Sequence, residues 1–265
     1  MSPNTPFLAA AVEAVQKAGA IHLKQVGRVV NVRSKGPADI VTDVDFEAER
    51  MFRALVAERF PGHGVLAEEM AESAGAAGGR YRWLFDPLDG TANYAHGVPF
   101  FCASLALEVD GVIEVAAVYD AGRDELFTAE RGGGALLNGR PLAVSRAPRI
   151  ADAMLGTGFP HGARARDPFM EQVLGECAAR ARGVRRLGSA ALDLCYVACG
   201  RLDGFWDRNL KAWDLAAGAL IVSEAGGTVT AFNGDPFDPY AGNVLASNGH
   251  LHAELLAVVR KPVAL

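Results

Sequence analysis

Apolar residues recur at helical spacing at the start of the chain and again after residue 42. The first 25 residues carry one apolar stripe, which predicts an amphipathic helix and is formed by Leu8, Val12, Val15 and residues 18–21. A second stripe follows Thr42 and consists of Met51, Phe52, Leu55, Val56 and Phe60. Pro61 and Gly62 come directly after it and predict the end of this second helix.

The pattern then changes to short apolar runs that are typical of strands. Runs at 65–67 and 81–85 come first, and runs at 102–109 and 112–119 flank the hairpin signal Asp110-Gly111. A further strand is predicted at 123–129. The second half alternates: we expect strands at 154–156, 184–187 and 204–206, and helices at 168–182, at 190–199, after Asp214 and at about 250–260. This order predicts layered α and β structure instead of a simple βαβ repeat.

Composition narrows the class of protein. The chain has 265 residues, of which 50% are hydrophobic, enough for one large domain or two coupled halves. It carries 26 basic and 31 acidic residues, a net charge of -5, which argues against a general nucleic-acid binder. An anionic substrate would meet a protein of the same sign, and cations at the site would compensate for this.

Cysteine usage and the N-terminus indicate a compartment. The four cysteines form no CxxC pair, which predicts free thiols in a reducing cytosol and a cytoplasmic protein. No apolar run is long enough for a membrane span. The apolar stretch 7–12 has no basic region before it and is followed by Glu13, so we expect no secretory signal.

The segment DPLDGTAN at 86–93 carries the strongest chemical signal. It follows the apolar run 83–85, so Asp86 and Asp89 are expected at the end of a buried strand. Two carboxylates three residues apart, with Pro87 stiffening the turn, can supply the oxygen ligands that Mg2+ prefers. Gly90 and Thr91 then let backbone N–H groups approach an anion closely. The structural alternative is an ordinary polar turn.

Three further acidic clusters have plain structural interpretations as well as chemical ones. Glu68 and Glu69 follow the strand 65–67 and are either a solvated loop or include a metal ligand. Asp214 stands where the last long helix is expected to begin, as an N-cap, a ligand or both. Thr42 with Asp45 matches a capping box, although Asp45 can also serve as the partner of a general base.

These clusters, in this order, resemble the inositol monophosphatase family of metal-dependent phosphatases. The resemblance rests on residues 38–45, 67–69, 86–93 and 211–227, so that it covers nearly the whole chain, and the block 93–99 adds to it. It implies an αβαβα layered sandwich of the sugar-phosphatase type: one α/β domain over 1–265 whose halves meet near residue 150. It further implies a Mg2+-dependent, lithium-sensitive homodimer acting on a small phosphorylated substrate.

The resemblance also implies roles for individual residues. The metal ligands would be Glu68, Asp86, the carbonyl of Leu88, Asp89 and Asp214. Backbone N–H groups of Gly90 and Thr91 would hold phosphate, and Thr91, supported by Asp45 and with Glu68 nearby, would orient the attacking water. Gly188, Ala190 and Asp207 would contact substrate hydroxyls. Asp207 stands where many relatives have Glu, which shortens its reach, and Lys35 lies close to a basic position of the family.

Two other functions stay open at this point. A different phosphatase substrate, such as fructose 1,6-bisphosphate, histidinol phosphate or a 3'-phosphoadenosine nucleotide, would require extra basic residues at the site. The sequence offers as candidates Arg164, Arg166, Arg185, Arg186 and Arg208. An alternative of another class is an interaction protein that binds transcription machinery. No Ser or Cys nucleophile with a His partner is evident, and we expect surface or packing roles for His96, His161, His250 and His252.

Overall fold

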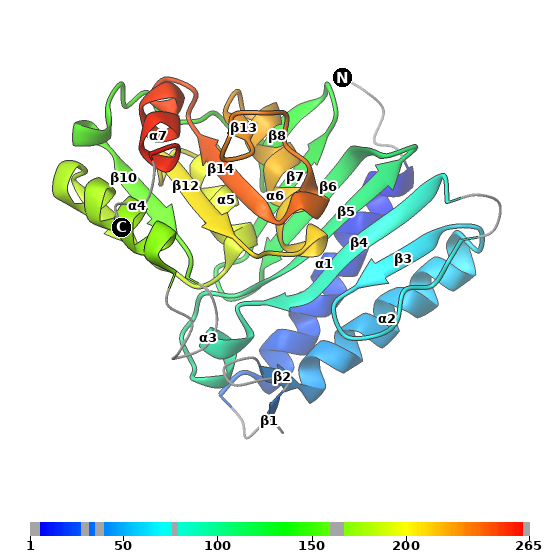
Figure 1. Cartoon of the computed structure of the whole chain (residues 1–265). Helices are drawn as coiled ribbons and strands as arrows, with labels where there is room; N and C mark the ends of the chain where they lie inside the picture. Colours follow the sequence, from blue (N-terminus) through cyan, green and yellow to red (C-terminus); the bar gives the residue numbers. More distant parts are fainter. Residues whose placement is uncertain (1–5, 28–31, 35–39, 76–78, 160–166, 262–265) are drawn as a thin grey trace.

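The computed structural model describes residues 6–27, 32–34, 40–75, 79–159 and 167–261. Helices and strands alternate in layers within these ranges (Figure 1). The helices are α1 Pro6–Gln25, α2 Asp43–Arg59, α3 Thr91–Ala95, α4 Pro168–Arg180, α5 Ala190–Ala198, α6 Ala212–Glu224 and α7 His252–Val259, with 3-10 helices at Ile150–Asp152 and Pro239–Ala241.

Two large sheets form the framework, together with a small antiparallel pair, β1 Val32–Ser34 and β2 Ile40–Thr42. The first sheet has strands in sequence order: β3 Gly64–Ala67, β4 Tyr81–Asp89, β5 Cys102–Val109, β6 Val112–Asp120, β7 Glu125–Glu130, β8 Gly134–Leu137 and β9 Arg140–Pro141. The second sheet has the order β11 Gly183–Arg185, β10 Met154–Thr157, β12 Gly204–Arg208, β14 Asn243–Ser247 and β13 Thr228–Thr230.

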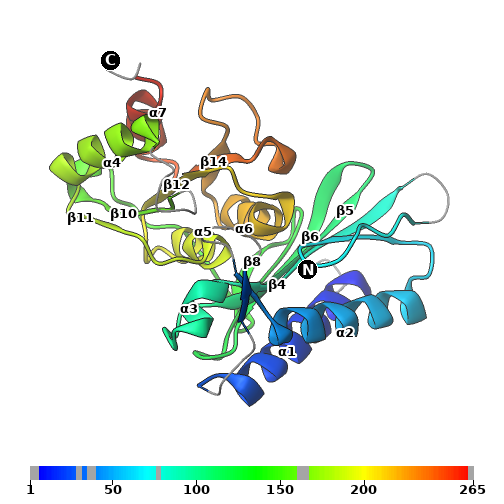
Figure 2. The same cartoon turned by 60° about the horizontal axis from the view of Figure 1, so that its bottom comes forward.

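Helices cover the faces of both sheets. α1 and α2 pack on one face of the first sheet, and α5 and α6 fill the space between the two sheets. α4 and α7 cover the outer face of the second sheet (Figure 2). The predicted αβαβα layering is therefore confirmed.

Alternation along the strands explains why both faces of each sheet are covered. Side chains of successive strand residues point to opposite faces. In β12, Phe205 packs in the central layer with α5 and α6, whereas Trp206 packs under α4 and α7. In β4, Leu84 faces the central layer, while Trp83 and Phe85 face α1 and α2. A sheet that is buried on both faces must carry continuous apolar runs, as these strands do.

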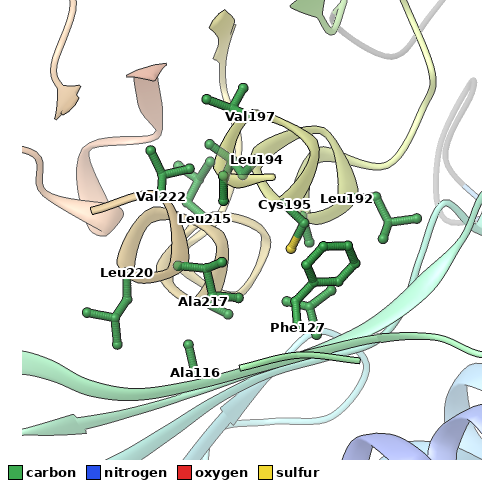
Figure 3. Close-up of a cluster of buried hydrophobic side chains, with 14 of the residues drawn as sticks. Ala116, Phe127, Leu192, Leu194, Cys195, Val197, Leu215, Ala217, Leu220 and Val222 are labelled. Atoms are coloured by element: carbon green, nitrogen blue, oxygen red, sulfur yellow. The ribbon is translucent and has the colours of Figure 1, made fainter. Parts of the chain in front are cut away.

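The central layer ties the two sheets together. Figure 3 shows Ala116 and Phe127 of the first sheet beneath the side chains of α5 and α6. Leu194 and Cys195 come from α5, and Leu215 comes from α6; all three side chains are fully buried. The pocket described below opens beside this layer, so its walls rest on tightly packed helices and strands.

Most elements lie where the hydrophobic pattern predicts them, and the exceptions have physical reasons. The predicted helix at 190–199 and the hairpin at 102–119 agree with α5 and β5–β6 within one residue. The pattern missed β1, β2, β8, β9, β13 and β14, although strand β14 is almost wholly buried. Short strands with half-buried edges, such as β13, carry too little periodicity to be recognised.

Candidate active site

A pocket of about 480 Å³ lies between the end of β4 and the elements α5, β12 and α6. It collects predicted site residues from distant parts of the chain. They are Glu68, Asp86, Leu88, Asp89, Gly90, Thr91, Gly188, Ala190, Asp207 and Asp214. The other predicted residue, Asp45, is fully buried and contacts the pocket through Thr91. The structure thus brings the whole predicted set together.

Strand β4 continues through Asp89 instead of ending before the acidic segment. The pairing of β4 with β5 shifts register between Asp86 and Asp89, as in a β-bulge, so the segment kinks between the two carboxylates. The Asp86 carboxylate accepts a hydrogen bond from the N–H of Leu88 at 2.9 Å. The alternative of an ordinary polar turn is therefore wrong, because these residues belong to an almost wholly buried strand.

Asp89 is held by the N-terminus of α5. Its Oδ2 atom accepts hydrogen bonds from the Ser189 hydroxyl and from the N–H of Ala191, both at 2.7 Å. The amide of Asn93 adds two bonds of 2.8 Å, to the carbonyls of Phe100 and Leu187. These contacts fix the loop after β4 against the second half of the chain.

Two glycines allow this close approach. Gly90 and Gly188 have φ values of +94° and +91°, a region that other residues rarely adopt. A Cβ atom on Gly90 would lie 2.9 Å from the carbonyl oxygen of Phe100 and 3.3 Å from that of Gly188. Glycine at these positions therefore lets the loop after β4 pack closely against the backbone of Phe100 and Gly188 and lets Gly188 approach the side chain of Asn93.

Asp214 lies inside its helix and not at the start of it. Helix α6 begins at Ala212 with Lys211 as its N-cap, so the expectation of an N-cap at Asp214 is wrong. Asp214 occupies the third helical position and accepts a hydrogen bond from the N–H of Lys211 at 2.7 Å. This bond turns the carboxylate back over the helix start and toward the pocket that it lines.

The acidic pair after β3 is not a solvated loop. Glu68 is half-buried and lines the pocket, while the N–H of the half-buried Glu69 donates to the buried Glu49 carboxylate at 2.8 Å. The Glu49 carboxylate also accepts from Arg53 at 2.8 Å. Glu49 thereby anchors the backbone that presents Glu68.

Asp45 has both a structural and a pocket-facing contact. One oxygen completes the predicted capping box of α2, accepting from the N–H of Thr42 at 2.8 Å and from its hydroxyl at 2.5 Å. The other oxygen lies 3.3 Å from the hydroxyl of Thr91, which also donates to the carbonyl of Leu88 at 2.8 Å. The capping interpretation is confirmed, and the Thr91 contact is additional to it.

Burial and mutual repulsion raise the pKa values of the pocket carboxyls. Burial raises the pKa of Asp86 well above its usual range, and the charges of Glu68, Asp89 and Asp214 add to it. Burial also raises the pKa of Asp214 well above its usual range, with the charge of Asp89 adding to it. The pKa of Asp89 rises to about 6 through burial, against the hydrogen bonds from Ser189 and Ala191. Such a cluster favours a positive ion among its members.

The donor set suits a hard cation. Four carboxylates and the carbonyl of Leu88 offer only oxygen ligands, as Mg2+ requires, with room for water. Within the described ranges, no three His, Cys, Asp or Glu side chains are already drawn together closely enough to hold a metal ion. The backbone N–H partners occupy one oxygen of the Asp86 carboxylate and one oxygen of the Asp214 carboxylate, and both residues line the pocket.

Two buried polar residues at the site were not predicted from the sequence. His22 is fully buried in α1, and its Nε2–H donates to the carbonyl of Pro87 at 2.8 Å, inside the acidic segment. Asp193 is 2% exposed and lines the pocket from α5. Each interrupts an apolar helical stripe in the sequence, a signal that could have been noticed.

The buried His22 predicts a specific dependence of stability on pH. Burial lowers its pKa to about 4, whereas the unfolded chain binds this proton near pH 6.5. Stability is therefore present above pH 6.5 and is lost as the pH falls toward 4. Between pH 7 and pH 5 we expect the free energy of unfolding to fall by about 2 kcal/mol more in the wild type than in His22→Leu. Urea unfolding at both pH values measures this difference.

The carboxyl groups titrate in the same way in the wild type and in His22→Leu, so their effect on the free energy of unfolding cancels in that comparison. His96→Leu is the matched control, because the side chain of His96 is exposed, and it should follow the wild-type curve. Parallel pH curves for the wild type and His22→Leu would show that His22 is not held neutral by the fold.

Several predictions concern other parts of the chain. Lys35, His161, Arg164 and Arg166 lie outside the described residues. As predicted, the four cysteines are free and three of them are buried. The surface or packing roles of the remaining histidines are confirmed: His96 and His250 are exposed, and His252 bonds to Thr230 and Ser247. No helix of the described residues is both long and apolar enough to cross a membrane.

Comparisons with known proteins identify the family of the chain. Residues 4–264 match the model of the inositol monophosphatase family. The inositol-1-monophosphatase of Rhizobium meliloti is 46% identical over 258 residues, covering 95% of each chain. The Nus factor SuhB of Pseudomonas aeruginosa is 41% identical over 264 residues and 96% of each chain. The structure of the extragenic suppressor protein suhB from Bartonella henselae superimposes with a TM-score of 0.93 at 40% identity, over 98% of this chain and 100% of that one. The chain therefore belongs to the inositol monophosphatase family and is a phosphoric monoester hydrolase.

Proposed function

We propose that the protein hydrolyses inositol 1-phosphate to inositol and phosphate in a Mg2+-dependent reaction. The observation that carries the proposal is one pocket that joins four carboxylates to the backbone of Gly90 and Thr91. Glu68, Asp86, Asp89, Asp214 and the carbonyl of Leu88 would hold the metal. Mg2+ bound there would place positive charge beside the phosphate and make a neighbouring water more acidic.

The residues of the chain supply positioning and proton transfer. The N–H groups of Gly90 and Thr91, two residues that line the pocket, would hold the phosphate oxygens. The Thr91 hydroxyl would orient the attacking water, and its bond to the buried Asp45 fixes its direction. Asp45 would take up the proton passed on by Thr91, with Glu68 at the same wall of the pocket. Hydrolysis of a phosphate ester requires such positioning more than covalent chemistry.

The charge of the pocket favours a monophosphate over a bisphosphate or a nucleotide. Of the described arginines that were candidates for a second phosphate, Arg186 lines the pocket, whereas Arg185 and Arg208 do not. Arg208 pairs with Asp167 at 3.2 Å and borders a separate cavity. Opposite the metal end, Gly188, Ala190 and Asp207 would contact the hydroxyl groups of the substrate. We also propose that lithium inhibits the protein and that it forms a homodimer.

Phosphate release tests the proposal directly. We expect the purified protein to release phosphate from inositol 1-phosphate with Mg2+ and to stop when EDTA is added. Fructose 1,6-bisphosphate, histidinol phosphate and 3'-phosphoadenosine 5'-phosphate form the comparison panel and should react more slowly. Release from none of the four compounds with metal present would contradict the proposal.

A second candidate is an interaction role in transcription. The observation that favours it is the 41% identity to a relative named Nus factor SuhB. Both roles can coexist on one protein, because the pocket occupies only part of the surface. A strain in which Asp89→Asn abolishes phosphate release but keeps the cellular phenotype would support the interaction role.

A further inference from the structure

Asp193 is a buried carboxyl group that the proposed mechanism does not use. It projects from α5, is 2% exposed and lines the pocket. Its Oδ1 atom is buried and has no hydrogen-bond partner among the described residues. Its neighbours in the helix, Leu192 and Leu194, are fully buried apolar side chains. A buried carboxyl without a partner is costly, so the carboxyl group itself calls for a binding partner.

Two glycines in one segment show where this carboxyl lies. A Cβ atom on Gly156 of β10 would be 3.6 Å from Oδ1 of Asp193. A Cβ atom on Gly158 would be only 1.8 Å from Oδ2 of Asp207, so that carboxylate rests directly on the backbone there. Parallel pairing of β10 with β12 aligns Gly156 with Phe205, which places Asp207 beside Gly158 on the same face as Phe205.

The two carboxyl groups therefore stand side by side over positions 156 and 158. Two residues of extended chain advance about 7 Å, so the two carboxyl groups lie over neighbouring positions at the end of β10. One oxygen of Asp207 accepts from the N–H of Arg208 at 2.7 Å, while Oδ1 of Asp193 has no such bond in the described structure. Asp193 thus has the larger remaining capacity to accept or share a hydrogen bond with a ligand.

The charge at this end of the pocket identifies the class of ligand. Two basic residues line the described part of the pocket, Arg186 and Lys211. The guanidinium of Arg186 lies 5.6 Å from the ring centre of Phe159. The charge of Arg186 opposes the effect of burial on the pKa of both Asp193 and Asp207. Two carboxyl groups around one guanidinium repel a second phosphate and suit the hydroxyl groups of a polyol.

We infer that Asp193 is a specificity-determining residue that recognises a substrate hydroxyl, beside Asp207. The inference rests on the proposed phosphatase function and deepens it, since it names two carboxyl groups that would recognise the hydroxyl groups of the substrate. Asp207 lines the pocket from β12, and Asp193 would supply a second contact from α5. The substrate class is a phosphate monoester of a polyhydroxy ring or chain.

The test compares two substrates that differ in free hydroxyl groups. For Asp193→Ala we expect kcat/KM for inositol 1-phosphate to fall about 10-fold, the effect of losing one hydrogen bond between uncharged groups. For phenyl phosphate, which has no free hydroxyl on its leaving group, kcat/KM should stay unchanged. The Mg2+ concentration for half-maximal rate should also stay unchanged. Asp193→Asn, which keeps one acceptor, should lie between Asp193→Ala and the wild type.

Controls separate recognition from folding. Asp120→Asn also changes a buried aspartate, but Asp120 pairs with Arg123 away from the pocket and should leave the ratio of the two substrates unchanged. Thermal unfolding should occur at or above the wild-type temperature in both Asp193 variants, because they remove an unpartnered buried carboxyl; if Asp193→Ala does not fold, Asp193→Asn decides.

Each result then has one meaning. A selective loss with inositol 1-phosphate supports the inference. Equal loss with both substrates, or no loss with either, in an active enzyme overturns the role of Asp193 and leaves the phosphatase function standing. A wild type that is inactive on both substrates with Mg2+ overturns the proposed function and the inference together.

Discussion

Asp89→Asn is expected to lower Mg2+-dependent phosphate release by on the order of 10³-fold. One oxygen of the Asp89 carboxylate already accepts hydrogen bonds from Ser189 and Ala191. Asparagine has one acceptor oxygen, so satisfying those two donors leaves an uncharged NH2 group facing the pocket. The variant thereby loses both a negative charge and an oxygen ligand where the metal would bind. Phosphate release from inositol 1-phosphate over a range of Mg2+ concentrations measures the effect.

Thermal unfolding distinguishes a lost ligand from a lost fold. Without metal, Asp89→Asn should be no less stable than the wild type, because Asp86 and Asp214 lose a repelling neighbour. Added Mg2+ should raise the unfolding temperature of the wild type by mass action, and that of the variant much less. Asp110→Asn, the same change at the exposed tip of the hairpin, is the control and should behave like the wild type. Full activity in Asp89→Asn would remove this residue from the site.

Asp45→Asn is expected to lower kcat by at least about 10²-fold, the usual contribution of a positioned general base. The carboxylate of Asp45 accepts from Thr42 with one oxygen and lies beside the Thr91 hydroxyl with the other. An amide can serve only one of these as an acceptor, so the direction of the Thr91 hydroxyl is lost. Steady-state kinetics with saturating Mg2+ measure kcat and KM separately.

A variant that disturbs the helix cap but keeps the Asp45 carboxylate provides the comparison. Thr42→Val removes the hydroxyl that accepts from the N–H of Val44 and donates to Asp45, and should cost about 1 kcal/mol of stability. Its kcat should fall far less than that of Asp45→Asn, since Asp45 still accepts from the backbone N–H at position 42. If both variants lost kcat equally, Asp45 would be a structural cap and no more.

Neighbouring residues determine the features that the sequence alone could predict. The stripes of α1 and α2, the hairpin of β5 and β6 and the capping box at Thr42 and Asp45 all depend on residues close in the chain. The acidic segment after the run 83–85 identified the metal end of the pocket for the same reason. Where local signals compete, the sequence was less informative: α6 begins at Ala212, and Asp214 takes the third helical position instead of the N-cap.

The tertiary structure decided how these segments meet. Asp89 and Ala191 are 102 residues apart and are joined only because α5 packs between the two sheets. His22 reaches the carbonyl of Pro87 only because α1 lies against the first sheet. In the sequence, Asp193 is a single acid in an apolar helix, and packing alone places it over Gly156 and beside Asp207. Local pattern records which face of an element is buried, whereas the partners across that face depend on the packing of whole layers.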